Sequence, residues 1–147
     1  MTIRRYVNFK IKKEEWGEYN LKDNTVLKTR FILVKIIDDG RRDEFGRPIY
    51  SIGSQIINAV FVPKELLGEP SEQIYTPSEL EQSIIEDDIA FEEIKEGVSI
   101  YELEDGYILE VKQILVSVAR TNKYDLRGEP IYLINTQPIF KLKKIRE

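Results

Sequence analysis

Two long stretches of the chain alternate apolar and polar side chains in the manner of β-strands. Residues Thr25–Ile37 and Tyr107–Ala119 are rich in β-branched and aliphatic residues, and each follows a tight-turn dipeptide, Asp23-Asn24 or Asp105-Gly106. In each stretch the apolar residues change face about halfway along, after residue 31 in the first. Because side chains alternate strictly along a regular strand, this change predicts a bulge or a sharp coil in both strands.

The same pattern occurs twice because the first part of the sequence resembles the second. An offset of 82 aligns residues 7–62 with 89–144 without a gap, and 18 of the 56 aligned positions are identical. The clearest match sets Asp43-Glu-Phe-Gly-Arg-Pro-Ile-Tyr against Asp125-Leu-Arg-Gly-Glu-Pro-Ile-Tyr. Coincidence between two β-rich stretches is the alternative, but clustered identities without gaps argue against it. We therefore expect an internal duplication, in which two repeats share one structural unit.

The connector between the repeats, residues 63–88, breaks the β pattern. Thr76-Pro-Ser-Glu79 is a capping box with proline at the first helical position, and Leu80 and Ile84 lie one turn apart. These signals predict a short helix from about Pro77 to Glu86. Helical periodicity would allow it to continue to Lys95, whereas the repeat alignment predicts a strand over residues 89–94; we favour the strand.

The length of 147 residues fits one domain, expected here to consist of the two repeats and the connector. The predicted fold is mainly β: an internally duplicated β-barrel or a pair of packed β-sheets with a pseudo-twofold relation, plus one short helix in the connector. Two subdomains with separate cores are the alternative, although units of this size would each be marginal alone. Lysines alternating with apolar residues in 7–12 and 140–143 are typical of edge strands.

The chain contains no histidine and no cysteine. Disulfides, zinc sites built on His or Cys, and Ser-His-Asp or Cys-His nucleophiles are thereby excluded. We predict no catalytic residue, no metal ligand and no cofactor, and the missing residue types weigh against an enzyme without deciding the question. No signal peptide or membrane-spanning run is recognisable, so a cytoplasmic location is expected. The paucity of thermolabile residues favours a thermophilic source.

Charge is strongly segregated along the chain, although the formal net charge is only −4. Residues 1–62 carry +4, residues 63–110 carry −13, and residues 111–147 carry +5. The acidic middle is either a solvated face or a surface that docks against basic patches of the same or another molecule. Docking between copies would make self-association sensitive to salt.

The polar loops that close each long hairpin, predicted at Asp38–Arg47 and Arg120–Glu129, are the candidate binding sites, because loops on a rigid β scaffold commonly carry binding. The candidate residues are Arg41, Arg42, Asp43, Arg47 and Tyr50 in the first repeat, and Arg120, Lys123, Tyr124, Asp125, Arg127 and Tyr132 in the second. The alternative is that Asp-x-x-Gly-x-Pro is turn chemistry, in which Asp bonds the backbone and Gly takes a positive φ.

Two further features allow a structural or a functional interpretation. The paired tyrosines, Tyr19/Tyr101 and Tyr50/Tyr132, could stack on nucleic-acid bases, but strand tyrosines more often pack in a core. The carboxylates of Glu86-Asp87-Asp88, with Glu92 and Glu93, lack the spacing of a calcium loop and are expected to be solvated.

The leading functional hypothesis is a non-enzymatic binding or assembly module that engages a protein partner, possibly another copy of itself, through the loops and the acidic connector. The first alternative is nucleic-acid binding through the loop cations and tyrosines, which a sequence pI near 5.1 disfavours. The second is an enzyme that uses carboxylates, lysine or tyrosine in a groove between the repeats.

Overall fold

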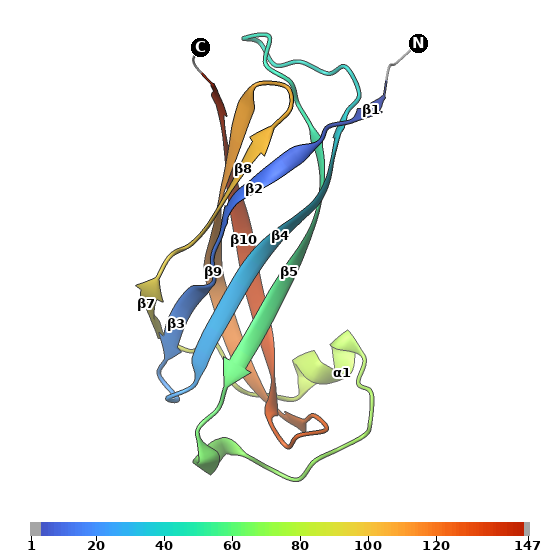
Figure 1. Cartoon of the computed structure of the whole chain (residues 1–147). Helices are drawn as coiled ribbons and strands as arrows, with labels where there is room; N and C mark the ends of the chain where they lie inside the picture. Colours follow the sequence, from blue (N-terminus) through green and yellow to red (C-terminus); the bar gives the residue numbers. More distant parts are fainter. Residues whose placement is uncertain (1–3, 146–147) are drawn as a thin grey trace.

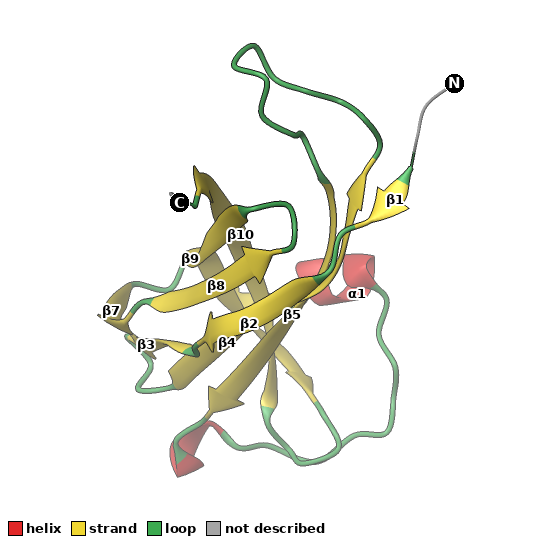
Figure 2. Cartoon of the chain, turned by 45° about the horizontal axis from the view of Figure 1, so that its top comes forward, coloured by secondary structure: helices red, strands yellow, loops and turns green. Residues whose placement is uncertain are grey.

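The computed structural model describes residues 4–145 as two antiparallel five-stranded sheets (Figures 1 and 2). The first sheet contains β1 (Arg5–Tyr6), β3 (Gly17–Leu21), β4 (Val26–Asp38), β5 (Ser51–Phe61) and β7 (Phe91–Lys95). The second contains β2 (Phe9–Glu14), β6 (Ile84–Glu86), β8 (Gly97–Leu103), β9 (Tyr107–Tyr124) and β10 (Pro130–Lys144). The mainly β prediction is confirmed. Within the described residues the sheets do not close into a barrel, so packed sheets are the form that the fold takes.

Each sheet includes one strand from the other half of the sequence. We call residues 7–62 the front half and residues 89–144 the back half. The first sheet runs β5-β4-β3-β7, so that β7 of the back half pairs with β3 of the front half. The second runs β10-β9-β8-β2, so that β2 of the front half pairs with β8 of the back half. The short strands β1 and β6 pair with the far ends of β4 and β9.

Several backbone contacts recur at the offset of 82 residues that aligns the two halves. The N–H of Val7 donates to the carbonyl of Ile36 at 2.9 Å, and that of Ile89 donates to Val118 at 2.8 Å. Contacts between the halves recur as well: Lys22 N–H donates to Ala90 at 2.8 Å, and Glu104 N–H donates to Asn8 at 2.9 Å. Each of these contacts thus has a counterpart 82 residues away.

A bulge interrupts both long strands, as their sequences predict. The register shift between Leu33 and Lys35 leaves Val34 unpaired in β4, and Val116 is left unpaired in the same way in β9. The predicted position, after residue 31, is wrong by a few residues, because Leu33 stays on the buried face with Phe31. Every residue of the run Phe31–Val34 is apolar, so its pattern cannot locate the change of face.

The interior consists of two hydrophobic clusters, and each draws on both halves. The first core cluster contains Val7, Phe31, Leu33, Ile36, Tyr101, Leu103, Leu109 and Val111. The second core cluster contains Tyr19, Leu21, Leu27, Ile89, Leu115 and Val118. At the offset of 82, these six residues correspond to six of the first cluster. The remaining two, Phe31 and Val111, correspond to Gln113 and Thr29, which are buried but polar.

Tyr19 and Tyr101 are core residues rather than stacking surfaces, since their exposed fractions are 1% and 0%. Each hydroxyl lies between backbone groups of the opposite half. Leu33 N–H donates to the Tyr101 hydroxyl at 3.1 Å, and Leu115 N–H donates to the Tyr19 hydroxyl at 3.3 Å. The two tyrosines thus connect the sheets at equivalent positions.

The connector holds one turn of 3₁₀ helix, Lys64–Leu66, and the helix α1, Pro77–Gln82. The predicted capping box at Thr76 and Glu79 is confirmed, with both of its hydrogen bonds formed. The helix ends earlier than predicted, because Ile84–Glu86 pairs with β9 as β6. A strand does form where residues 89–94 are predicted to be extended, but β7 runs from Phe91 to Lys95 and leaves residues 89 and 90 outside it. No helix within residues 4–145 is long and apolar enough to cross a bilayer.

Candidate functional site

The two hairpin loops lie at opposite ends of the molecule (Figure 1). We call residues 39–50, between β4 and β5, the front loop, and residues 125–129, between β9 and β10, the back loop. The predicted back loop, Arg120–Glu129, is too long, since β9 continues to Tyr124. The candidate residues therefore form two separate groups, one around each loop, and do not converge on one site.

The tips of the two loops share one geometry. In the front loop the Asp43 carboxylate accepts the N–H groups of Phe45 and Arg47 at 2.8 and 2.9 Å. In the back loop Asp125 accepts the N–H groups of Arg127 and Glu129, both at 2.9 Å. The glycine that follows has a φ of 80° at Gly46 and 77° at Gly128. The shared Asp and Gly residues thus have the roles that the turn itself requires.

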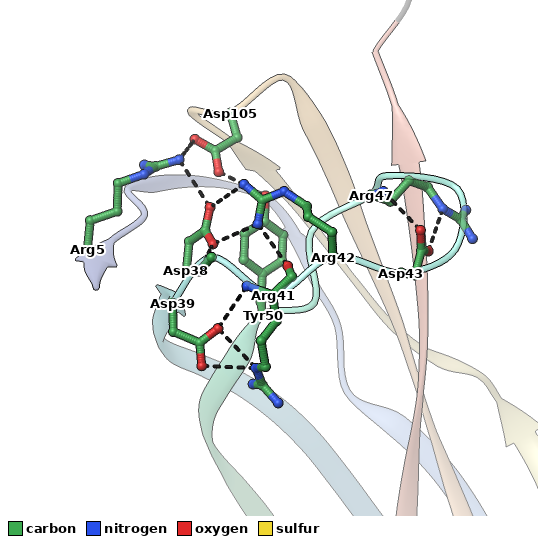
Figure 3. A network of polar contacts seen from close by, with 10 residues as sticks. Arg5, Asp38, Asp39, Arg41, Arg42, Asp43, Arg47, Tyr50 and Asp105 are labelled. Carbon is green, nitrogen blue, oxygen red and sulfur yellow. Dashed lines mark hydrogen bonds and ion pairs between the residues drawn. The ribbon is translucent and has the colours of Figure 1, made fainter. Parts of the chain in front are cut away.

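A network of ion pairs supports the base of the front loop (Figure 3). The buried Asp38 carboxylate accepts a hydrogen bond from Arg42 at 3.0 Å and lies 3.5 Å from Arg5. Arg5 also pairs with Asp105, which accepts a hydrogen bond from the Tyr50 hydroxyl at 2.9 Å. The hydrogen bond from Arg42 holds the pKa of Asp38 below its ordinary value. Burial, with the bond to Asp105, raises the pKa of Tyr50.

The base of the back hairpin has the same tyrosine contact but the opposite charge at one position. The Tyr132 hydroxyl donates to Asp23 at 2.7 Å, as Tyr50 does to Asp105. Arg120, which replaces Asp38 at the offset of 82, lies 3.4 Å from Asp23 and donates to Glu86 at 2.9 Å. Burial is the main cause that raises the pKa of Tyr132. At each end, therefore, the turn aspartate of one half is held by a tyrosine of the other.

The remaining loop cations are also engaged. Arg41 pairs with Asp39 at 2.9 Å and Arg47 with Asp43 at 3.0 Å. At the other end Arg127 pairs with Glu129 at 3.0 Å. The Lys123 ammonium lies 5.4 Å from the centre of the Tyr75 ring. A phosphate group would have to displace a carboxylate to reach any of these three arginines, which lowers their value as a nucleic-acid contact.

The connector covers the back loop but not the front loop. Gly68 N–H donates to the carbonyl of Gly128 at 2.8 Å, and Ser71 N–H donates to that of Asp125 at 3.0 Å. Gly68 packs so closely on the ring of Tyr124 that no β-carbon fits between them. Gly128 is consequently buried, whereas Gly46, its equivalent, is exposed. Among the described residues, no N–H group donates to the carbonyl of Gly46.

A groove of about 530 Å³ lies between the end of β5 and the start of β10. Asp125, Arg127 and Tyr132 line part of it, but each makes the turn, ion-pair or hydrogen-bond contact described above. Within residues 4–145 no three His, Cys, Asp or Glu side chains are grouped so that they could hold a metal ion. The groove therefore offers no set of free polar groups for acid–base chemistry.

Sequence analysis missed the residues that complete the two end networks, namely Arg5, Asp23, Asp38, Glu86 and Asp105. One signal was available, because Asp23 and Asp105 are identical at the offset of 82. It indicated a turn and nothing more, since an aspartate two residues before a strand commonly bonds the local backbone. Only the exchange of β2 and β7 between the sheets brings these turns to the tyrosines of the opposite half.

Comparison of the chain with family models, with curated proteins and with solved structures gives no match.

Proposed function

We propose that this protein is a non-enzymatic binding module whose front loop docks an extended segment of a protein partner. The observation that carries the proposal is the contrast between the loops. The back loop holds such a segment, residues 68–71 of the connector, through two backbone hydrogen bonds. The front loop has the same tip geometry and leaves the equivalent position open.

The bound segment of the back loop defines the chemistry of the ligand. Gly68-Glu69-Pro70-Ser71 lies extended across the tip, and its backbone N–H groups meet the carbonyls of Gly128 and Asp125. The equivalent acceptors in the front loop are the carbonyls of Gly46 and Asp43. Recognition through the backbone requires an extended ligand and tolerates many side chains. The three arginines of the front loop are each paired with a carboxylate, so the backbone rather than charge defines the ligand.

The front loop also differs from the back loop in ways that suit a separate partner. Phe45, with 74% of its surface exposed, stands where the back loop has Arg127. Large exposed aromatic residues are enriched in the centres of protein interfaces. Arg42 occupies the place of Tyr124, against which Gly68 packs in the back loop. A ligand of the front loop therefore does not need a glycine at the position that Gly68 has in the connector.

The proposal includes an internal duplication with a pseudo-twofold relation between the halves. Its support is the set of backbone and side-chain contacts that recur at the offset of 82, together with the equivalent bulges and loop tips. A duplicated unit explains why the chain carries two docking positions. One has become occupied by the connector, and the other is left for a partner. We place this module in the cytoplasm, since a chain without cysteine has no need of an oxidising compartment.

Binding of a labelled peptide with the sequence of residues 66–75 to the whole protein tests the proposal by fluorescence polarisation. We expect saturable binding. Phe45→Glu places a carboxylate at the tip and should weaken binding about tenfold, the equivalent of about 1.4 kcal/mol. Val116→Glu, an equal change on an exposed residue of β9, should leave the affinity unchanged. Absence of binding at low salt, or equal affinity for wild type and Phe45→Glu, would overturn the proposal.

A further inference from the structure

The edge strand β5 differs from every other edge of the two sheets. Within residues 4–145 it pairs only with β4, so that its second side carries backbone groups without a partner strand there. Its eleven residues, Ser51–Phe61, include no charged side chain and no proline. Ile56 and Ile57, near its middle, are 36% and 42% exposed. A long, uncharged and partly apolar edge is a ready template for another strand.

The other edges carry the features by which proteins prevent strand addition. β2 has three lysines within six residues, and β7 has two glutamates and a lysine within five. β10, the equivalent of β5, has Pro138 where β5 has Ile56. It also has Lys141 and Lys143 where β5 has Ala59 and Phe61. Proline removes a donor from the ladder, and lysine opposes close approach of a second strand.

We propose that β5 pairs with β5 of a second copy of this chain, in antiparallel orientation across a twofold axis, to form one continuous ten-stranded sheet. The absence of charged side chains from β5 favours a second copy of the same strand as its partner. A twofold axis through an antiparallel pair places each residue opposite its mirror position in the same strand. Any charged residue near the axis would therefore face its own like charge, and β5 has none.

A register centred on Ile56 sets Ile56 against Ile56, Gln55 against Ile57, and Ser54 against Asn58. The nearest cations belong to β4, which lies one strand further from the axis on each side. The contacts across the axis are backbone hydrogen bonds and uncharged side chains, which salt does not screen. Dimerisation through β5 is therefore expected to persist at high salt. Docking at the front loop is measured by peptide binding and pairing through β5 by sedimentation, so the two proposals can fail independently.

Sedimentation velocity of matched variants tests the inference. Ile57 and Ile139 are equivalent, identical and similarly exposed, at 42% and 50%. Wild type and Ile139→Lys should sediment as dimers at low and high salt, whereas Ile57→Lys should be monomeric. If circular dichroism shows that Ile57→Lys is unfolded, Gln55→Lys with its control Gln137→Lys replaces the pair, because both glutamines are exposed.

Crosslinking provides a second measurement, because the chain has no cysteine of its own. In the centred register, cysteines introduced by Ile56→Cys face one another at a separation close to that of a disulfide. Mild oxidation should yield a covalent dimer from Ile56→Cys and none from Pro138→Cys. A monomeric wild type would overturn the inference. So would a dimer that survives both β5 lysine substitutions, or one that is lost equally in the β10 controls.

Discussion

The front and back hairpins share a bulge, a loop-tip turn and several backbone contacts but differ in loop length and in what remains accessible. In the back hairpin the connector covers the loop, and proline and lysine protect the edge strand β10. In the front hairpin the loop tip is uncovered, and the edge strand β5 has no charge. Residues that maintain the fold are alike in the two halves, such as the turn aspartates and the tyrosines that bind them. The loop tips and the edge strands differ where a second molecule can approach.

The interior contains a second difference, and it predicts the largest effect on stability. Phe31 is buried in the first core cluster, and its equivalent Gln113 is buried beside the second. Neither polar atom of the Gln113 side chain has a hydrogen-bond partner among the described residues. Phe31→Ala should lower the free energy of unfolding by about 3–5 kcal/mol. Gln113→Met keeps the length of the side chain and removes its unpaired polar atoms. This substitution should therefore raise the free energy of unfolding by about 1–3 kcal/mol.

Chemical denaturation of the two variants at one pH measures these changes. A destabilising Gln113→Met would show that the Gln113 side chain has partners that the comparison of the clusters does not account for. Equal losses of unfolding free energy from Phe31→Ala and Gln113→Ala would show that the two side chains contribute equally to the packing of the core.

The loop glycines test what the connector contributes. Gly46 and Gly128 both have a positive φ, so alanine at either position should cost about 1–2 kcal/mol. Only at Gly128 would the new β-carbon also lie within 2.5 Å of the Gly68 carbonyl oxygen. Gly128→Ala should therefore displace the connector, with a further loss of about 1–3 kcal/mol from its two backbone hydrogen bonds.

Thermal melts compare the two alanine variants, and limited proteolysis reports where the chain opens. Cleavage within residues 67–75 should become faster in Gly128→Ala and stay unchanged in Gly46→Ala. Equal stability and equal cleavage of both variants would show that the connector does not depend on the back loop.

The tyrosine contacts at the two ends predict a smaller, pH-dependent effect. Tyr132→Phe should cost about 1.5–3 kcal/mol, because Tyr132 donates to the buried Asp23 carboxylate. Tyr50→Phe should cost about 1 kcal/mol, because Asp105 is more exposed and keeps its pair with Arg5.

Both tyrosines have a pKa in the folded state above that of the unfolded chain. The fold therefore favours the protonated hydroxyl, and its contribution is complete below about pH 10, the ordinary tyrosine pKa. It is lost as the pH rises further. Wild type should lose stability more steeply than either Phe variant above that pH, as followed by denaturation at a series of alkaline pH values. Parallel pH curves for all three proteins would contradict the assignment.

Much of the local structure follows from the sequence, whereas the partners of the strands do not. The capping box at Thr76, the turns at Asp43 and Asp125, and the bulges all depend on nearby residues and are predictable. The pairing of β2 with β8 depends on residues about ninety positions apart. The alternation of apolar and polar residues along Phe9–Glu14 would fit an edge of either sheet, so it does not identify the partner strand. The sequence likewise cannot show that Gly68 lies on Tyr124, because that contact depends on the path of the connector.

The central claim is that the front loop offers the docking position that the connector fills in the back loop. Titration of the isotope-labelled protein with the peptide of residues 66–75, followed by amide NMR spectra, tests this residue by residue. We predict shifts at residues 43–47 that saturate as a single site, with residues 125–129 unmoved. Shifts confined to residues 125–129, or none at saturating peptide, would contradict the account.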